Sequence, residues 1–148
     1  MENKPEEALT PGQRIAHMSN VLLPSRQFKQ YIDEMANILD ESILYIDSAH
    51  TLKGKESVLR MLERYVPRVA NDRYQFDLLV DTETHLIWRW CIALKIRFLP
   101  FNFLIHGLVH AELREGKIVY QREYFDPMES IGMIPLVGWF YKLILKMA

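Results

Sequence analysis

The chain has little cysteine, little net charge and no long hydrophobic run, and each shortage excludes a class of protein. Cys91 is the only cysteine among 148 residues, so an intrachain disulfide cannot form and a thiolate zinc site has too few ligands. The formal net charge is −1 and the basic residues are scattered, which disfavours nucleic-acid binding. No apolar run reaches the ~20 residues that span a bilayer.

The composition is that of one globular domain, with 49% hydrophobic and 25% charged residues. The first seven residues are polar and acidic and lack the apolar run of a secretory signal. Together with the single cysteine, they favour a reducing, cytoplasmic location. We expect a disordered tail over residues 1–9, one α+β domain over 10–128, and an apolar helical extension over 129–148.

Helical periodicity dominates the first half of the chain. A short helix is expected to begin at Pro11, because proline is favoured at the first helical position. Ser25 is predicted to cap a second helix, in which apolar residues from Phe28 to Leu39 recur every three or four positions. A third helix is expected over Lys55–Val69, with a kink or stop at Pro67.

The period then changes from helical to two, which is typical of strands with one buried face. Strands are expected over residues 43–47, 74–80, 86–98, 103–113 and 118–125. In the longest, Leu86, Trp88 and Trp90 point one way while Arg89 and Cys91 point the other. Helices followed by hairpin-linked strands predict an α+β fold with an antiparallel sheet, and a strand as long as 86–98 is expected to bend.

Two segments resemble the nuclear transport factor 2-like superfamily, in its SnoaL-like branch. One is Tyr45-Ile-Asp47, followed after a loop by Gly54-Lys-Glu56 at the start of a helix. The other is Gly116-Lys-Ile-Val-Tyr-Gln-Arg-Glu-Tyr-Phe-Asp126-Pro127. The resemblance implies a cone-shaped fold, in which helices cover the concave face of a curved antiparallel sheet and enclose a mainly apolar pocket. The superfamily includes ketosteroid isomerases, polyketide cyclases, epoxide hydrolases, dehydratases and non-catalytic binding or dimerisation modules, so the fold alone assigns no reaction.

The resemblance places two carboxylates at the pocket. Asp47 matches the general base of the isomerase-like members, and Glu123 on the last strand would face it as a second acid/base group. Two other roles stay open: Asp47 as a loop residue that caps the turn after its strand, and Glu123 as the partner of a cation at the pocket rim. The position of the isomerases' protonated acid falls near Val109, so their oxyanion donor is missing and ketosteroid isomerisation is not expected.

Six further residues are expected to contact a ligand in the pocket: Tyr45, Trp88, Trp90, Val109, Gln121 and Phe125. The two tryptophans could stack on a planar or isoprenoid-like molecule, although filling the core is the simpler role for at least one of them. No cofactor is expected. A metal site is rejected, because His106 and His110 would lie ~13 Å apart along an extended strand.

The C-terminal segment, 135–147, predicts a helix with almost no polar face, whose only charges are Lys142 and Lys146. The apolar side chains of such a helix must be covered. The helix could lie over the mouth of the pocket, pack against a second copy of the chain, or rest on an anionic membrane surface. With the outward-facing residues 106, 108 and 110, it suggests a homodimer. Two functions are therefore open. The first is a protein that binds a small hydrophobic ligand in the apolar pocket and could also act on it by acid/base chemistry of isomerase, cyclase, dehydratase or epoxide hydrolase type. The second is a non-catalytic dimerisation or membrane-surface binding module.

Overall fold

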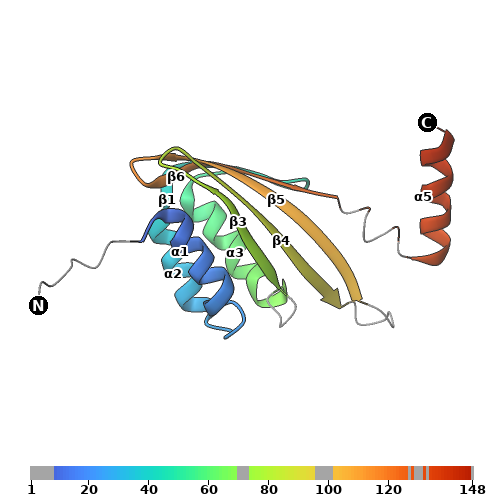
Figure 1. The fold of residues 1–148 in the computed structure, drawn as a ribbon, viewed down its shortest axis with the longest axis horizontal. Coiled ribbons are helices and arrows are strands. Elements are labelled where there is room, and N and C mark those ends of the chain that lie inside the picture. Colours follow the sequence, from blue (N-terminus) through green and yellow to red (C-terminus); the bar gives the residue numbers. More distant parts are fainter. Residues whose placement is uncertain are drawn as a thin grey trace, which may run out of the picture.

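The computed structural model describes residues 9–69, 74–95, 102–126, 128, 132 and 134–147 (Figure 1). In chain order its elements are α1 (Pro11–His17), the π-helical segment η1 (Met18–Leu22), α2 (Phe28–Ile38), β1 (Leu39–Ile46), β2 (Thr51–Lys53), α3 (Lys55–Val69), β3 (Gln75–Asp81), β4 (His85–Lys95), β5 (Asn102–Arg114), β6 (Lys117–Phe125) and α5 (Pro135–Met147). The predicted tail at residues 1–8 and the end of the predicted strand at 96–98 lie outside the described residues.

The six strands form one open sheet in the order β2-β1-β6-β5-β4-β3. All neighbours are antiparallel except β1 and β6, which run parallel with Tyr45 opposite Gln121. The expectation of a wholly antiparallel sheet is therefore wrong at this one pair. The two strands come from opposite ends of the domain, so no hairpin connects them and no turn imposes an antiparallel direction.

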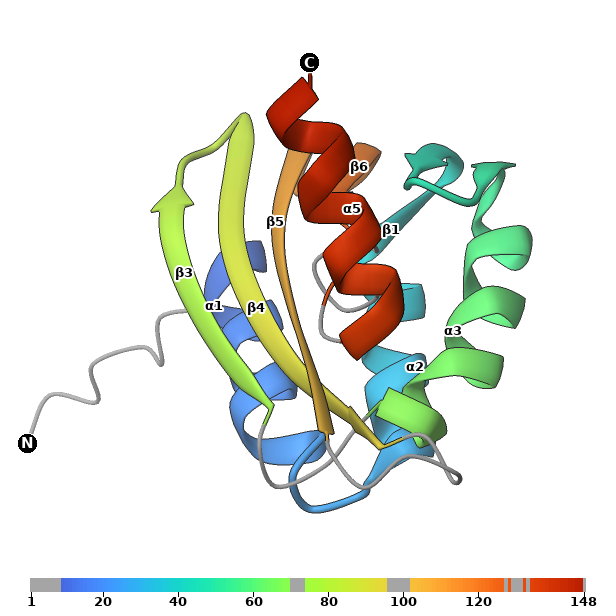
Figure 2. The same ribbon diagram turned by 90° about the vertical axis from the view of Figure 1, so that its right-hand side faces the viewer.

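The sheet is curved, and α1, α2 and α3 lie on its concave side (Figures 1 and 2). The predicted phase of β4 is confirmed, since Leu86 and Trp88 are buried while Arg89 is exposed and pairs with Asp77 on the outer face. The largest fully buried side chains come from both layers: Met18, Ile38, Leu39, Ile43, Val58, Leu86, Val109 and Ile118. The core thus lies between the helices and the concave face, as the α+β prediction requires.

Three local predictions are wrong. Ser25 does not cap α2, because the left-handed backbone of Arg26 (φ 57°) separates it from a helix that begins at Phe28. Strand β2 occupies part of the segment expected to be a loop before Gly54. Of the kink or stop expected at Pro67, the stop is wrong, because α3 continues through this residue to Val69.

Gly54 fixes the entry to α3. Its φ of +84° is a left-handed conformation that side chains rarely adopt, and its N–H donates to the carbonyl of Ile43 at 2.8 Å. This bond ties the start of the helix to β1, the strand that leads into Asp47. A glycine at this place in the sequence motif therefore has a geometric reason.

Helix α5 stands apart from both layers (Figure 1). Its apolar side chains are exposed: Leu136 76%, Val137 41%, Trp139 60%, Phe140 57%, Leu143 41%, Ile144 63%, Leu145 58% and Met147 80%. The helix has the predicted bounds, but within the described part of the chain nothing covers these side chains. No helix of the described residues has the length and apolar character needed to cross a membrane.

Candidate functional site

A cavity of about 300 Å³ lies between the concave face of the sheet and the three helices. Apolar side chains from α1, α2, α3, β4 and β5 make up most of its wall, among them Ile15, Met35, Leu62, Trp88 and Ile105. A mainly apolar cavity therefore lies where the ligand pocket was expected, and ligand binding in it stays a prediction. Its volume is at the lower end of the range for ligand pockets, which suits a small molecule.

The parallel pairing of β1 with β6 gathers four polar side chains on one wall. Tyr45 lies opposite Gln121 in this pairing. Because side chains on a strand alternate between faces, residues two further along each chain return to the same face, which places Asp47 and Glu123 beside the first pair. All four line the cavity. The two carboxylates predicted to meet at the pocket thus do so, and the sheet topology explains why.

Asp47 is held by several donors. Its Oδ1 accepts from the backbone N–H groups of Ala49 at 2.7 Å and His50 at 2.6 Å, and its Oδ2 accepts from the Tyr45 hydroxyl at 3.1 Å. The Nδ1 atom of His50 lies 3.1 Å from both carboxylate oxygens. The side chain is only 8% exposed. Asp47 therefore caps the turn after β1, as the alternative interpretation expected, and also faces the cavity.

Glu123 has an unusual carboxyl group. Burial, the larger cause, and the nearby charge of Asp47 raise its pKa, while hydrogen bonds with Gln121, whose Nε2 lies 3.1 Å from Oε1 of Glu123, and with Tyr45 lower it. The net effect is a rise from 4.5 to about 7. The site therefore favours the protonated form of Glu123 more than water does. Among the residues that the structure describes, no cation pairs with this acid, so the alternative role as the partner of a cation at the rim finds no support in these contacts.

One end of the Gln121 amide has no partner. The residue is 5% exposed and lines the cavity, and its Oε1 makes no hydrogen bond with any described residue. Turning the amide over would exchange the two ends and leave the nitrogen unpaired instead. A buried polar atom without a partner costs about 1–3 kcal/mol, so this atom is a good acceptor for a ligand.

Aromatic rings form the wall opposite the helices. Trp88 is 6% exposed and packs against Phe76, with ring centroids 6.3 Å apart. Trp90 is less buried, and its ring centroid lies 5.9 Å from that of Phe125. Both tryptophans line the cavity. The expectation that at least one of them fills the core fits Trp88 best. Trp90 and Phe125 are the rings more available to a ligand.

Val109 is the predicted ligand contact that the structure places elsewhere. It is fully buried between Trp88 and Glu123 in the strand pairing and is not among the residues that line the cavity. Its small side chain supports the floor of the site rather than its surface. Position 109 carries no acid, and the carboxyl group next to it in the sheet is that of Glu123, its partner on β6.

Several lining residues were missed in the sequence. The hydroxyl-bearing side chains of Ser19, Tyr31 and Tyr74 reach the cavity from the helices and from the start of β3, and His50 reaches it from the turn after β1. Burial raises the pKa of both Tyr31 and Tyr74, so their hydroxyl groups remain donors. For Tyr31 the sequence offered one indication, its place on the apolar stripe of the helix, which predicts a side chain that points to the interior.

A second hollow of about 460 Å³ opens beside the end of β6. Its lining includes Asp47, Glu123 and Phe125, which it shares with the inner cavity, and also Arg122 and Asp126. The two carboxyl groups thus stand between an enclosed apolar space and a wider, more polar one. Among the described residues that line the inner cavity, no three side chains of metal-binding type lie close enough together to hold one ion.

No protein-family model matches the chain, and no curated protein matches its sequence. Solved structures do match. A protein with a ketosteroid isomerase-like fold from Catenulispora acidiphila, solved with trimethylamine, has 14% identity and a TM-score of 0.60 over 82% of this chain and 91% of its own. This chain has a nuclear transport factor 2-like fold. The predicted fold is confirmed, while the SnoaL-like branch stays a prediction.

Two further matches show how varied proteins of this fold are. An LEH-like epoxide hydrolase from M. tuberculosis has 19% identity and a TM-score of 0.55 over 82% of this chain and 86% of its own. A putative isomerase from Bacillus subtilis has 11% identity and a TM-score of 0.59 over 84% and 96%. At these identities the likeness concerns the fold, so any assignment of a reaction depends on the side chains in the cavity.

Proposed function

We propose that the protein is an enzyme that moves protons on a small, neutral, mainly apolar molecule. The observation that carries the proposal is the meeting of Asp47 and Glu123 on one wall of the cavity, with the pKa of Glu123 raised to about 7. Two carboxyl groups in different environments can act as a pair, one as the acid and the other as the base. The reaction class that uses such a pair most directly is dehydration, or hydration in reverse.

In this reaction Asp47 accepts a proton from a substrate carbon. The backbone N–H groups of Ala49 and His50 orient its carboxylate. Glu123 donates its proton to the departing hydroxyl group, which leaves as water while the carbon–carbon double bond forms. The enzyme is restored when the proton on Asp47 returns to Glu123, and the Tyr45 hydroxyl, which hydrogen-bonds with both groups, lies between them.

The side chains in the cavity wall indicate which kind of substrate would bind. Among the described residues that line the inner cavity there is no lysine or arginine, so none of them would neutralise a carboxylate or phosphate. The unpaired Oε1 of Gln121 suits a substrate hydroxyl group, which could donate to it. The hydroxyl groups of Tyr31 and Tyr74 are donors suited to a carbonyl oxygen that gains charge during proton removal. A small hydroxy-ketone with an apolar body fits this set.

The matching structures agree with such chemistry without assigning it. They include an LEH-like epoxide hydrolase and a putative isomerase. The support they give is for a fold whose cavity can host an enzyme. The choice of dehydration rests on the carboxyl groups and on Gln121.

The test is turnover of small cyclic β-hydroxyketones, followed by NMR in D₂O to detect both water loss and exchange of the proton next to the carbonyl. Wild-type protein should accelerate both. Asp47→Asn should abolish exchange, and Glu123→Gln should lower water loss by roughly 10²-fold or more, the typical contribution of a general acid. The matched control is Glu83→Gln, which changes an exposed carboxylate in the turn between β3 and β4. Equal rates for wild type, Asp47→Asn and Glu123→Gln would refute the proposal.

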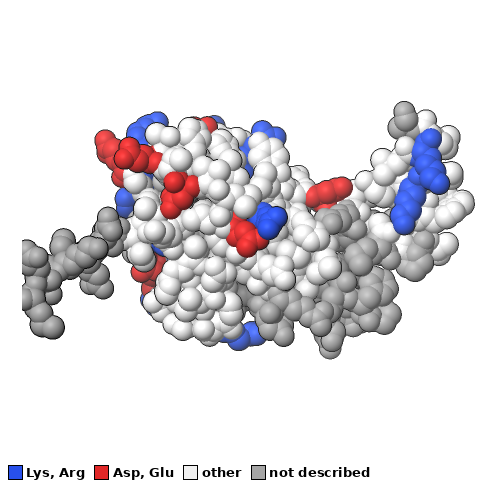
Figure 3. Space-filling model, viewed as in Figure 1, with Lys and Arg blue, Asp and Glu red and all other residues white. Residues whose placement is uncertain are grey.

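The exposed helix α5 favours a second function, attachment to an anionic membrane surface. Lys142 and Lys146 lie one turn apart and form a stripe along the helix (Figure 3), and the helix carries no acid. At 100° per residue, Phe140 and Ile144 lie on the opposite side, where they are 57% and 63% exposed. A helix of 13 residues is ~20 Å long, so it can lie in the interface with its apolar side toward lipid.

A further inference from the structure

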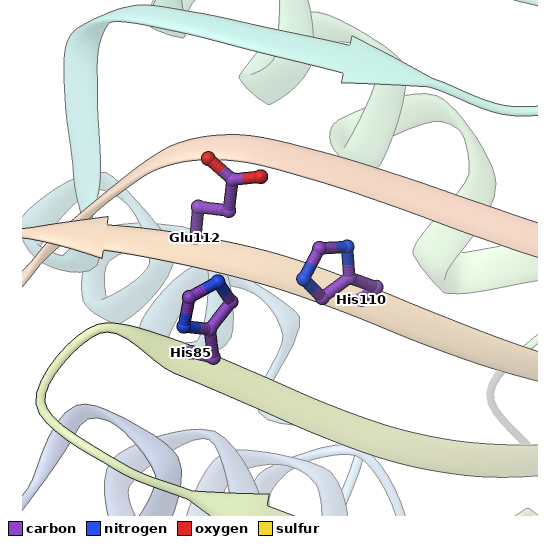
Figure 4. A group of neighbouring side chains, drawn as sticks. All are labelled: His85, His110 and Glu112. Atoms are coloured by element: carbon purple, nitrogen blue, oxygen red, sulfur yellow. The ribbon is translucent and has the colours of Figure 1, made fainter.

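The outward face of the sheet, away from the cavity, brings together two histidines and a glutamate (Figure 4). His85 at the start of β4 lies opposite Glu112 of β5. His110 precedes Glu112 by two residues, so its side chain points to the same face. One nitrogen of each ring and one carboxylate oxygen all lie within 4.8 Å of one another. The three side chains thus form a compact triangle across two strands.

Neighbouring side chains hold the two rings. The rings of His85 and His110 stack, with centroids 5.5 Å apart and planes 9° apart. On its other side His110 contacts the ring of Tyr120 edge-on at 6.2 Å. The Nδ1 atom of His85 lies 2.9 Å from the hydroxyl of Thr84, which leaves Nε2 of that ring for another partner. The contacts with Tyr120 and Thr84 are of the kind that orient the ligands of metal ions in proteins. A shared ion would lie in the plane of both imidazole rings, so the His85 ring would turn out of the stack to bind it.

The donor set, two imidazole nitrogens and one carboxylate oxygen, is chemically specific. Imidazole suits zinc and its neighbours in the first transition row, whereas magnesium and calcium prefer oxygen alone. Zinc bonds of about 2.0–2.2 Å in a tetrahedron place neighbouring donors about 3.4 Å apart. His85 and Glu112 are exposed, so small rotations of their side chains can close the remaining gap, while the half-buried His110 stays in place.

We propose that His85, His110 and Glu112 bind one divalent transition-metal ion, with Zn²⁺ as the best match. Three protein ligands leave a fourth position for water or for a donor from another molecule. The ion would join β4 to β5 on the outer face and stabilise the folded state by mass action. The site lies on the other side of the sheet from Asp47 and Glu123, so it stands or fails independently of the proposed reaction.

The sequence led us to reject a metal site because His106 and His110 lie far apart on one strand and the remaining histidines, His85 among them, are scattered along the chain. That spacing argument says nothing about His85, which a separate strand contributes. Only the β4–β5 register brings His85 opposite Glu112, and the register is a product of the fold. The spacing of residues along one strand therefore could not predict this group of three, which comes from two strands.

The test uses the full chain, stripped with a chelator and titrated with Zn²⁺ in a calorimeter. Wild-type protein should bind one equivalent. His85→Ala, His110→Ala and Glu112→Gln should each weaken binding by at least about tenfold, since even supporting contacts of metal ligands contribute that much. His17→Ala, which removes an exposed histidine on α1, should leave binding unchanged. Circular dichroism should show that all four variants remain folded, since each change lies at or near the surface.

Thermal unfolding gives an independent readout. Zn²⁺ should raise the melting temperature of wild type and of His17→Ala, and should leave that of His110→Ala unchanged. Two results would overturn the site: no binding by wild type, or binding that the three ligand variants leave intact. Loss of binding in His50→Ala, with His110→Ala unaffected, would also overturn it, because the ion would then lie in the cavity.

Discussion

The indole ring of Trp90 occupies the space above Gly107. A Cβ atom added to Gly107 would lie 2.3 Å from the Cε2 and Cζ2 atoms of the ring, far inside contact distance. The two residues are paired across β4 and β5, and Gly107 is also paired with Phe125 of β6. Because Gly107 has no side chain, the Trp90 ring can lie over β5 and contact the ring of Phe125 on β6. This arrangement shapes one wall of the cavity.

Gly107→Ala should destabilise the protein by about 1–3 kcal/mol, because the Trp90 ring must leave its position in a packed wall. Urea unfolding measures the change. In a Trp90→Phe background the smaller ring leaves room for the added methyl group, so the same substitution should cost much less. An equal cost in both backgrounds would mean that the two residues are not coupled in this way.

Glu123→Gln should change how stability depends on pH. In the wild type, folding raises the pKa of Glu123 from 4.5 to about 7, so this carboxyl favours the folded state below pH 4.5 and loses that advantage as pH rises through 7. The loss from this group is up to about 3 kcal/mol. Glutamine matches the neutral acid in shape, so the variant should gain on wild type between pH 4.5 and 8.

Urea unfolding at pH 4.5, 6 and 8 reads this out as the difference between variant and wild type. Asp77→Asn is the matched control, since Asp77 is an exposed carboxylate paired with Arg89 on the outer face. Its difference from wild type should show no comparable rise over the same interval. A constant difference for Glu123→Gln would show that Glu123 ionises freely in the folded protein.

Helix α5 should bind vesicles that contain phosphatidylserine. Trp139 is 60% exposed, so its fluorescence should shift to the blue when the helix enters the interface. The double change Phe140→Glu and Ile144→Glu should abolish binding, and Lys142→Glu should weaken it on anionic vesicles. Leu79→Glu, at another exposed apolar residue on β3, is the control and should bind like wild type. Binding that is equal for all variants would exclude α5 as the contact.

The outer face of the sheet should form a homodimer contact. Leu108 and Tyr124 lie opposite each other on β5 and β6 and are 41% and 49% exposed. Sedimentation at micromolar concentration should give the mass of a dimer, and Leu108→Glu should give a monomer, because a two-fold contact places the new charge in the interface twice. A wild-type monomer would contradict this prediction.

Local patterns predicted much of the fold. The alternation of Leu86 and Trp88 with Arg89 fixed which face of β4 is buried, because a period of two depends only on neighbouring residues. The C-terminal helix began at Pro135 as expected. Predictions failed where the backbone leaves the common regions, as at Arg26, whose left-handed φ delays the start of α2.

The site was predicted only in part, for a non-local reason. Asp47 and Glu123 were identified by resemblance, but their proximity depends on a parallel pairing between the first and last strands. His50 was not predicted as a site residue, because its contact with Asp47 arises from a tight turn that no sequence pattern indicated. The outward pair of His85 and Glu112 depends in the same way on strand register.

The most direct test of the account is an NMR titration of the Glu123 side-chain carboxyl in wild type and in Asp47→Asn. The pKa of Glu123 should lie near 7 in wild type and lower in the variant, because the variant removes a neighbouring negative charge while burial remains. Asp77→Asn should leave the value unchanged. A pKa near 4.5 in wild type, or the same value with and without the Asp47 charge, would contradict the proposed acid/base pair.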